Sequence, residues 1–533
     1  MISEYHGRLV SDIAGRLIER LRAVGTHTLV GVPGGGGNLD LIEAARGVGL
    51  PFVLTSTETA AAIVALAQSE VTGRPGACLT TLGPGAASAV NGIACAHLDR
   101  APIVVFTDSN PIGAGGKFAH QQLDQLALFA PITKWSGRLT EPDADEVIER
   151  AFREVVGVPP GPVHVDCPGD VKKVSGRAEA GVRARSVPET ARSVEKRSDP
   201  IKPLVIVGLG ARRDAGAIRG FCERLNAPAM VTYKAKGVVP DAHPCFAGLF
   251  TNGAIEREIL DRSDLLIGIG LDPVELLPRP WTISQPIIGI SRWRMADDHV
   301  PFADQWVMDI PSALAQLEAK MRPSAWDLDA TARIVREQRT RIDIPAPGLT
   351  PQRVVAMTAQ ILAATSRVTV DAGAHMFPAT IGWPVSEPNG MLISNGLSTM
   401  GFALPAAIGA ALVDRSRAVV ALTGDGGLLM CAGELLTAAR ERLRVITVVL
   451  NDASLSLIEI KQHARRLPPA GVALGAVKWA ALAESLGVAG FEAATEPELS
   501  RALDGAAAVQ GPSLIDVKVD RSVYGEMLKV IRG

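Results

Sequence analysis

Short apolar runs bounded by glycine and proline alternate with amphipathic stretches along most of the chain. The first such runs are Thr28–Val32, Gly76–Thr81, Pro102–Thr107 and Pro162–Asp166. Runs that are apolar at nearly every position are typical of parallel strands, because helices cover both faces of a parallel sheet. The alternation therefore predicts an α/β protein built from doubly wound parallel sheets.

Two polar segments divide the 533 residues into three groups of predicted strands. Residues 175–200 mix Arg, Lys, Ser and Glu without apolar periodicity, and residues 324–349 are polar and end among prolines, so both are predicted linkers. The predicted domains are residues 1–180, 195–335 and 345–533. The later predicted elements are the strands Leu204–Val207, Ala229–Thr232, Leu265–Ile269 and Pro286–Ile290, the helix Pro311–Met321, and the strands Ala418–Leu422, Val445–Leu450 and Ser513–Val517.

The first and third groups share a pattern that the second lacks. Leu82-Gly83-Pro84-Gly85 and Leu397-Ser398-Thr399-Met400 each lead through a small-residue helix to an apolar strand. Two related units are therefore expected to flank an unlike, Rossmann-like middle one. Gly208-Leu209-Gly210-Ala211 opens the middle unit, and a plain strand-to-helix turn is favoured there over a dinucleotide contact, because the third glycine of the fingerprint is missing.

Composition excludes several classes of protein. Apolar residues make up 47%, charged residues 21%, and the formal charge is −2, so no polybasic surface for nucleic acid or anionic lipid is predicted. The apolar runs are shorter than the ~18–20 residues that span a bilayer, and residues 1–20 are charged rather than signal-like. The six cysteines are too far apart in sequence for a CxxC site or a disulfide scaffold. These features predict a cytoplasmic protein with no nucleic-acid or membrane partner.

Gly424-Asp425-Gly426-Gly427 directly follows the predicted strand Ala418–Leu422 and precedes a helix predicted around Gly433–Arg442. The carboxyl ends of parallel strands are where open α/β sheets bind ligands, and bare glycines let a phosphate approach the backbone. An aspartate beside a phosphate indicates a hard divalent cation between the two. A tight turn with Asp425 as the helix cap is the alternative interpretation.

The next strand ends in Asn451-Asp452-Ala453-Ser454, which also supplies oxygen donors. Two neighbouring strand ends of this kind provide about half of an octahedral Mg²⁺ shell, which a diphosphate and water would complete. An ordinary Asn-Asp turn is the alternative for this motif taken alone.

GDG followed by an Asn-containing strand end resembles the metal and diphosphate signature of thiamine diphosphate enzymes. Over nearly its whole length the chain is similar to the pyruvate oxidase and acetohydroxyacid (acetolactate) synthase group, whose domains bind the pyrimidine, form a central unit and bind the diphosphate, in that order. The resemblance implies thiamine diphosphate with Mg²⁺ or Ca²⁺, held by Asp425, Asp452 and the Ser454 carbonyl. Relatives have Asn where this chain has Asp452, and Asn451 is the alternative ligand.

The resemblance assigns further roles in cofactor binding. Glu58 matches the glutamate that faces the aminopyrimidine ring and shares a proton with it, although Thr55-Ser56-Thr57-Glu58 also fits a structural capping box with Thr55 at the cap. Met400 matches the residue beneath the bent cofactor; a core methionine at a helix start is the alternative. His375 matches a diphosphate contact, or is a structural histidine. The implied cofactor-binding residues are Pro33, Glu58, Gly85, Ala374, His375, Ser398, Met400, Asp425, Gly426, Gly427, Asp452, Ser454, Leu455, Ser456 and Leu457.

In this family the cofactor lies between the first domain of one subunit and the third domain of another. The resemblance therefore implies a homodimer or homotetramer with active sites at the subunit interface.

The substrate-side residues differ from those of simple decarboxylases. Gly35 stands where pyruvate decarboxylase-like enzymes have an aspartate and benzoylformate decarboxylase-like enzymes have a serine. Thr81 stands where the second type has a histidine, and Ile458 replaces the glutamate of the first type. Because few titratable groups lie near the reacting carbon, joining the acyl unit to a second carbonyl compound is favoured over protonating it. The expected catalytic residues are Glu58, Gly35, Gly36, His120 and Gln121, where Gln121 is retained and His120 replaces an aromatic residue; a loop histidine facing water is the alternative for His120.

Other departures bear on the product. The arginine expected just after Gly270 is missing, Lys461 replaces the tryptophan that selects the acceptor, and the flavin-loop pattern at 248–253 is blurred. These argue against acetolactate as the product and against bound FAD.

The sequence thus predicts a thiamine diphosphate- and Mg²⁺-dependent lyase or transferase that decarboxylates a 2-oxo acid, or cleaves an acyloin-like substrate, with carboligation as in acetolactate synthases. A 2-hydroxyacyl-CoA lyase or oxalyl-CoA decarboxylase type, a C–C bond hydrolase with His120 activating water, and a cofactor-binding regulatory subunit are the alternatives.

Overall fold

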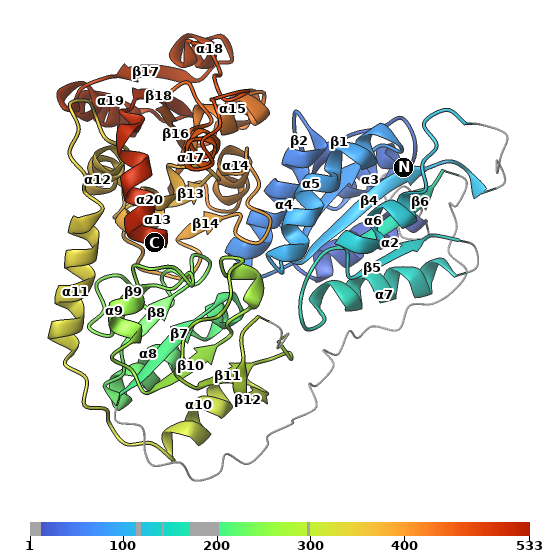
Figure 1. Ribbon diagram of the computed structural model, residues 1–533. Coiled ribbons are helices and arrows are strands. Elements are labelled where there is room, and N and C mark those ends of the chain that lie inside the picture. Colours follow the sequence, from blue (N-terminus) through green and yellow to red (C-terminus); the bar gives the residue numbers. More distant parts are fainter. Residues whose placement is uncertain (1–11, 113–118, 141–142, 170–201, 296–298) are drawn as a thin grey trace.

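The computed structural model describes residues 12–112, 119–140, 143–169, 202–295 and 299–533. Three six-stranded sheets follow one another along the chain, and each pairs its strands in parallel (Figure 1). The prediction of three doubly wound parallel sheets is confirmed. The predicted domain boundaries stay predictions, and the first predicted linker lies outside the described residues.

The first sheet has the strand order β2-β1-β3-β4-β6-β5. Its strands are β1 (Leu29–Val32), β2 (Phe52–Leu54), β3 (Gly76–Thr80), β4 (Ile103–Ser109), β5 (Trp135–Arg138) and β6 (Val163–Pro168). The helices around it are α2 (Ile13–Ala23), α3 (Gly37–Gly47), α4 (Glu58–Thr72), α5 (Pro84–Leu98), α6 (Gln125–Phe129) and α7 (Ala144–Val156).

The third sheet repeats this order as β14-β13-β15-β16-β18-β17. Its strands are β13 (Ser366–Val370), β14 (Met391–Ile393), β15 (Ala418–Gly424), β16 (Val445–Asn451), β17 (Ala489–Ala493) and β18 (Ser513–Lys518). Its helices are α12 (Pro351–Leu362), α13 (Met376–Gly382), α14 (Ala403–Val413), α15 (Asp425–Cys431), α16 (Glu434–Arg440), α17 (Ser456–Ala464), α18 (Trp479–Ser485), α19 (Glu496–Ala508) and α20 (Tyr524–Arg532). The predicted kinship of the outer units is therefore visible in their topology.

The middle sheet has a different order, β12-β11-β10-β7-β8-β9, in which the chain winds outward from β7 and β10 in both directions as in Rossmann folds. Its strands are β7 (Pro203–Val207), β8 (Ala229–Val231), β9 (Phe246–Leu249), β10 (Leu265–Ile269), β11 (Ile287–Ser291) and β12 (Phe302–Val307), with helices α8 (Ala215–Leu225), α9 (Arg257–Leu260) and α10 (Ile310–Glu318). The backbone N–H of Leu209, in the glycine turn after β7, donates to the buried carboxyl of Glu275 at 2.8 Å, so this turn packs against the chain itself.

The structure differs from the sequence interpretation in two local details, the second of which concerns the alternative offered for Glu58. The polar segment 324–349 contains the helix α11 (Leu328–Arg341), capped by Asp327, whose side chain accepts from Ala330 N–H. α4 is capped by Thr57, whose hydroxyl accepts from Ala60 N–H, so Glu58 is the first helical residue and not the third of a capping box at Thr55. Its carboxyl is consequently not used by the cap.

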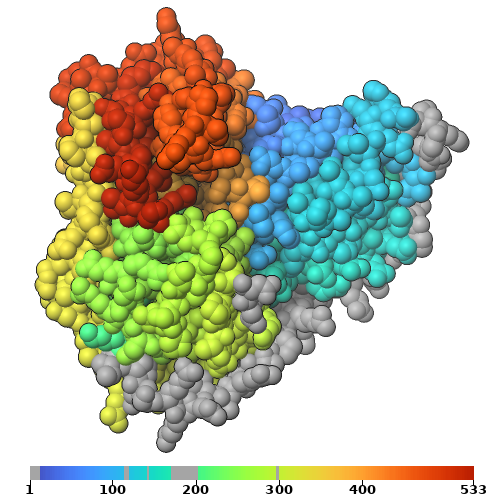
Figure 2. Space-filling view, in the orientation of Figure 1, coloured from blue at the N-terminus to red at the C-terminus, as the bar shows by residue number. Residues whose placement is uncertain are grey.

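The first and third domains share one hydrophobic core. It contains alanines of α4 and of α14, and every residue of α14 from Ala403 to Leu412 is buried. The helices approach closely because small residues face one another: a Cβ added to Gly409 would lie 2.5 Å from the carbonyl oxygen of Val64. Figure 2 shows the blue first domain in contact with the orange third and green middle domains.

All six cysteines are buried and unpaired, as expected from their spacing. Among the residues that the structure describes, no helix has both the length and the apolar character needed to cross a membrane.

Candidate active site

A cavity of about 270 Å³ opens at the carboxyl edge of the third sheet. It lies between the ends of β13 and β15, where the chain changes winding direction and where open α/β sheets bind ligands. All of its lining residues belong to the third domain: Ala372, Gly373, Ala374, His375, Met376, Phe377, Ser398, Met400, Gly424, Asp425, Gly426, Gly427, Leu450, Asp452, Ser454, Leu455, Ser456, Leu457, Ile458, Lys461, Tyr524 and Arg532. The structure thus brings together in one cavity every cofactor residue predicted after residue 370.

Two carboxylates face this cavity. Asp425 is the first residue of α15, which begins directly after β15 and was not predicted as a separate helix. Burial raises the pKa of Asp425 to about 6, and the nearby charge of Asp452 adds to the effect. Burial also raises the pKa of Asp452, whose Oδ2 accepts from the Ser456 hydroxyl at 2.6 Å. Asp425 is buried and Asp452 half-buried, and two neighbouring acids whose charged forms are disfavoured are candidates for holding a cation.

The remaining predicted metal ligands are less exposed to the cavity. Ser454 is buried in its wall, whereas the side chain of Asn451 points toward β18 and donates to Asp516 Oδ1 at 2.8 Å. Asn451 is absent from the cavity lining, so the geometry favours Asp452 over it. Within the described part of the chain, no group of three or more His, Cys, Asp or Glu side chains is placed to hold a metal ion. A metal here would depend on two carboxylates, backbone oxygen and oxygens of a bound ligand.

The opposite wall can receive an anion. His375 is buried, burial lowers its pKa to about 4, and its Nε2 has no partner among the described residues. A neutral imidazole in this position can donate one hydrogen bond into the cavity. Gly426 and Gly427 at the start of α15 line the cavity without side chains, and Gly427 packs closely against Asp371: a Cβ on Gly427 would lie 2.6 Å from Asp371 Oδ2.

Asp371 is a buried residue that the motifs did not identify as functional. It accepts hydrogen bonds from the N–H groups of Ala372, Gly401 and Phe402 and from the Thr423 hydroxyl, so it ties three cavity segments together. Burial raises its pKa to about 6. Its position after β13 follows the same strand-end rule as Asp425. Tyr524 and Arg532 were also missed, because they come from the C-terminal helix α20 and follow no strand.

Ser398 and Met400 lie on the segment that follows β14. Ser398 has a left-handed backbone with φ of 54°, and Gly401 follows with φ of 77°. Met400 is half-buried, and its Cε is 3.5 Å from where a Cβ on Gly426 would stand. Its side chain therefore reaches across the cavity toward the glycines of α15.

A second group of predicted residues gathers at the corresponding edge of the first sheet. A Cβ on Gly85 would lie 3.1 Å from Glu58 Oε1 and 2.8 Å from the Thr81 methyl, and one on Gly83 would lie 2.3 Å from the carbonyl oxygen of Gln121. Pro33, Gly35, Gly36, His120 and Gln121 are exposed, whereas Glu58 is half-buried. None of these residues lines the cavity of the third domain in the same chain.

Asp108, at the carboxyl end of β4, supports the loop at 33–37. Its Oδ1 accepts from Asn38 N–H at 2.8 Å, and a Cβ on Gly34 would lie 2.7 Å from its Oδ2. Burial raises the pKa of Asp108 to about 6. Sequence reasoning missed this residue, although its place at a strand end was a usable signal.

Glu434 connects the start of α4 to the third domain. Its Oε1 accepts from the N–H groups of Ser56 and Thr57 at 2.9 and 3.1 Å, and its Oε2 accepts from the Thr437 hydroxyl at 2.8 Å. Burial raises the pKa of Glu434 to about 7. The two residues before Glu58 are thus fixed by a carboxyl group from a distant part of the chain.

We expect Glu434→Gln to stabilise the protein more at pH 8 than at pH 5. The native pKa lies above the ordinary value of 4.5, so wild-type stability is lost as the pH rises toward about 7, whereas glutamine keeps the acceptor and has no charge to bury. The gain at pH 8 should reach up to ~3 kcal/mol, about 1.4 kcal/mol for each pKa unit. Thermal unfolding of both proteins at the two pH values measures this gain. An equal difference in Tm between the proteins at pH 5 and at pH 8 would contradict a raised pKa for Glu434.

Comparisons with known proteins agree with this architecture. Residues 12–128 match the family model "Thiamine pyrophosphate enzyme, N-terminal TPP binding domain", residues 197–317 match the central domain, and residues 371–517 match the C-terminal TPP binding domain. The chain is 30% identical to acetolactate synthase of Bacillus subtilis, over 95% of this chain and 93% of the relative. It is 29% identical to the catabolic acetolactate synthase of Raoultella terrigena, over 97% and 96%.

A relative named as a decarboxylase is as similar to this chain as the acetolactate synthases are. The chain is 30% identical to a probable 2-ketoarginine decarboxylase of Pseudomonas aeruginosa, over 95% of this chain and 94% of the relative. All three domain models match in the expected order, and they cover more than half of the chain. The chain therefore belongs to the thiamine diphosphate-dependent enzymes and is acetolactate synthase-like among them.

Proposed function

We propose that this chain is a Mg²⁺- and thiamine diphosphate-dependent enzyme that decarboxylates a 2-oxo acid and joins the remaining acyl unit to a second carbonyl compound. The observation that carries the proposal is the single cavity in which Asp425, Asp452, the bare start of α15, His375 and Met400 meet. One side of this cavity offers groups that suit a cation, and the other side offers groups that suit an anion.

The residues present fit a metal-bound diphosphate. The unpartnered Nε2 of His375 and the backbone at Gly426 and Gly427 would hold phosphate oxygens. Asp425, Asp452 and the Ser454 carbonyl would hold Mg²⁺, which neutralises the two acids. Met400 and Ser398 would support the rings of the cofactor. When bound, the cofactor supplies the electron sink that a decarboxylation requires.

The protein's own contributions are positioning and proton transfer. Glu58 of a second copy would hold a proton beside the aminopyrimidine ring, and the loop at 33–37 would face the reacting carbon. On the substrate side, Gly35 carries no side chain and Ile458 lies in the cavity wall, so neither supplies an acid. Lys461 and Arg532 add positive charge to that wall, which suits anionic 2-oxo acids.

We propose that the active site is completed by a second copy of this chain, in a homodimer or in a homotetramer of such pairs. Glu58 does not line the cavity of its own chain, and the first and third domains both expose apolar side chains. Arg440 donates to the carbonyl of Leu54, and Met430 Cβ is 3.3 Å from where a Cβ on Gly401 would stand, which places these segments together. The apolar residues are Leu54 (40% exposed), Leu397 (37%), Leu429 (45%), Met430 (59%) and Leu436 (45%).

We expect Met430→Asp to give monomers and to abolish activity together with assembly. A carboxylate placed in an apolar interface must be desolvated without a partner, which costs several kcal/mol. Light scattering coupled to gel filtration measures the mass, and activity is assayed over a range of protein concentrations. Val156→Asp, a change at an exposed apolar residue of α7, is the control and should alter neither. A Met430→Asp dimer with normal activity would contradict the proposed interface.

The function is tested by incubating the purified protein with thiamine diphosphate, Mg²⁺ and a panel of 2-oxo acids, with and without an added aldehyde or second 2-oxo acid. We expect CO₂ from at least one substrate and a longer 2-hydroxy ketone when an acceptor is present, both detected by mass spectrometry. If only the aldehyde is released in the presence of acceptors, the proposed ligation is wrong and the enzyme is a simple decarboxylase. Turnover that requires CoA esters, or water as the only acceptor, would favour the lyase or hydrolase alternatives.

A chain that binds the cofactor but turns over nothing would support the regulatory-subunit alternative.

We also propose a cytoplasmic enzyme, which the six buried, unpaired cysteines support.

A further inference from the structure

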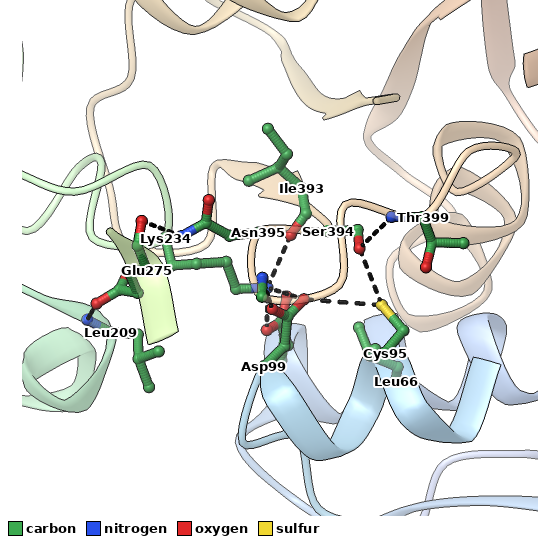
Figure 3. A network of polar contacts seen from close by, with 12 residues as sticks. Leu66, Cys95, Asp99, Leu209, Lys234, Glu275, Ile393, Ser394, Asn395 and Thr399 are labelled. Carbon is green, nitrogen blue, oxygen red and sulfur yellow. Dashed lines mark hydrogen bonds and ion pairs between the residues drawn. The ribbon is translucent and has the colours of Figure 1, made fainter. Parts of the chain in front are cut away.

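The segment from Ile393 to Met400 carries two of the proposed cofactor residues, and most of its anchors lie in other domains. Figure 3 shows it lying across the end of α5. The Asp99 carboxyl accepts from Gly396 N–H at 2.9 Å, and the Cys95 thiol donates to Ser394 Oγ at 3.2 Å. Ser394 Oγ also accepts from Thr399 N–H at 2.9 Å. The conformation that presents Ser398 and Met400 is therefore fixed partly from the first domain.

Lys234, which follows β8 in the middle domain, joins these anchors. Its Nζ donates to the Ile393 carbonyl at 3.0 Å and lies 3.1 Å from Asp99 Oδ2 and 2.6 Å from Glu70 Oε1 (Figure 3 shows the first two). Its side chain is 1% exposed. One ammonium group thus contacts the first domain through two carboxylates and the cofactor segment through a backbone carbonyl.

Two cations and two carboxyl groups meet around Lys234, and burial together with the charge of Glu70 raises the pKa of Asp99. Arg212 also pairs with Glu70 at 2.9 Å, so two cations face the two carboxylates. Burial alone would lower the pKa of Lys234, but Asp99 and Glu70 outweigh it and raise this pKa above its usual value. Burial likewise favours the neutral form of Glu70, but Lys234 and Arg212 hold the pKa of Glu70 below its usual value. The lysine is consequently charged and has three N–H donors for its three acceptors.

Lys236, two residues along, provides a comparison. It is equally buried, pairs with Asp241 at 3.2 Å, and donates to the carbonyls of Thr380 and Trp383 at 2.8 and 2.9 Å. It also joins the middle domain to the third, but through the far end of α13 and not through the 393–400 segment. Both lysines are buried and join the middle domain to the third, but burial lowers the pKa of Lys236, and only Lys234 contacts the cofactor segment.

We propose that Lys234 is a positioning residue for the cofactor: with Asp99 it fixes the 393–400 segment in the conformation that presents Ser398 and Met400 to the cavity. The inference rests on the proposed function for the identity of the ligand. The position of the segment is a property of the free protein, so it can be measured without cofactor. A purely structural role would make Lys234 and Lys236 equivalent.

The test compares Lys234→Met with Lys236→Met at matched loss of Tm. Thiamine diphosphate affinity is measured by calorimetry with saturating Mg²⁺, and hydrogen exchange is followed in the free protein for peptides covering 393–402. We expect Lys234→Met to weaken binding by about 10-fold or more and to accelerate exchange in this segment, because small displacements of a binding group are costly. Lys236→Met should do neither.

The same loss of affinity in both variants, or unchanged exchange at 393–402 in Lys234→Met, would overturn the inference. If Lys234→Met does not fold, Ser394→Ala replaces it; this change removes the acceptor of both Thr399 N–H and the Cys95 thiol and should loosen the same segment and weaken binding in the same way. Should wild-type protein take up no thiamine diphosphate, the proposed function fails, whereas the exchange comparison still decides whether Lys234 fixes the segment.

Discussion

Glu58→Gln is expected to lower kcat by about 10²–10⁴-fold while the protein keeps its fold and most of its affinity for thiamine diphosphate. The proposed role of Glu58 is to hold a proton beside the cofactor ring, and glutamine preserves the shape but cannot exchange that proton. The side chain is free for this role because Thr57 caps α4 and Glu58 takes no part in the cap. Steady-state rates at saturating cofactor, together with calorimetric binding, separate the proton-transfer role from a binding role.

Glu43→Gln provides a matched control for this experiment. Glu43 lies on α3 of the same domain and pairs with Arg46 at the surface, so its loss should leave the rate unchanged. A Glu58→Gln enzyme with more than half of the wild-type kcat would contradict the assignment of Glu58 and would favour a regulatory or purely cofactor-binding chain.

Asp425→Asn is expected to weaken Mg²⁺-supported binding of thiamine diphosphate by at least about 100-fold, since an amide is a weaker ligand for a hard cation than a carboxylate. The change also removes one of the two neighbouring acids of the cavity, the one whose pKa the charge of Asp452 helps to raise. The variant should therefore be at least as stable as wild type without metal, although it binds the cofactor worse. Opposite changes in stability and affinity are the distinguishing result.

Calorimetric titration with and without Mg²⁺, and thermal unfolding in EDTA, provide both measurements. Asp414→Asn is the control: Asp414 accepts from Ser416 N–H in the turn after α14, remote from the cavity, and asparagine can keep that bond. Wild-type affinity that does not depend on divalent metal, or an unchanged affinity in Asp425→Asn, would contradict the proposed metal site.

The sequence revealed the framework of the site because that framework sits at strand ends. Glycine and acid motifs after β15 and β16 are local patterns, and parallel strands bring their carboxyl ends to one edge. The kinship of the outer units was predicted from the two small-residue segments, and the structure shows it as a repeated strand order. The strand runs were correctly predicted because burial on both faces leaves few polar positions in them.

The features that sequence missed depend on contacts between distant segments. Glu434 holds Ser56 and Thr57, and Lys234 holds Ile393, through bonds that no local pattern encodes. Helix α11 was missed because its surface is largely polar and its helical signal is the cap at Asp327. Tyr524 and Arg532 reach the cavity from a C-terminal helix whose path depends on packing against the completed third domain.

The core shared by α4 and α14 has a genetic consequence. It packs the first and third domains of one chain against each other while Glu58 stays out of the third-domain cavity of that chain, which is why we propose that each catalytic centre takes its Glu58 from a neighbour. Under the proposed assembly, an allele that damages Glu58 and an allele that damages Asp425 would complement each other, because their mixed dimer holds one centre in which both residues are intact.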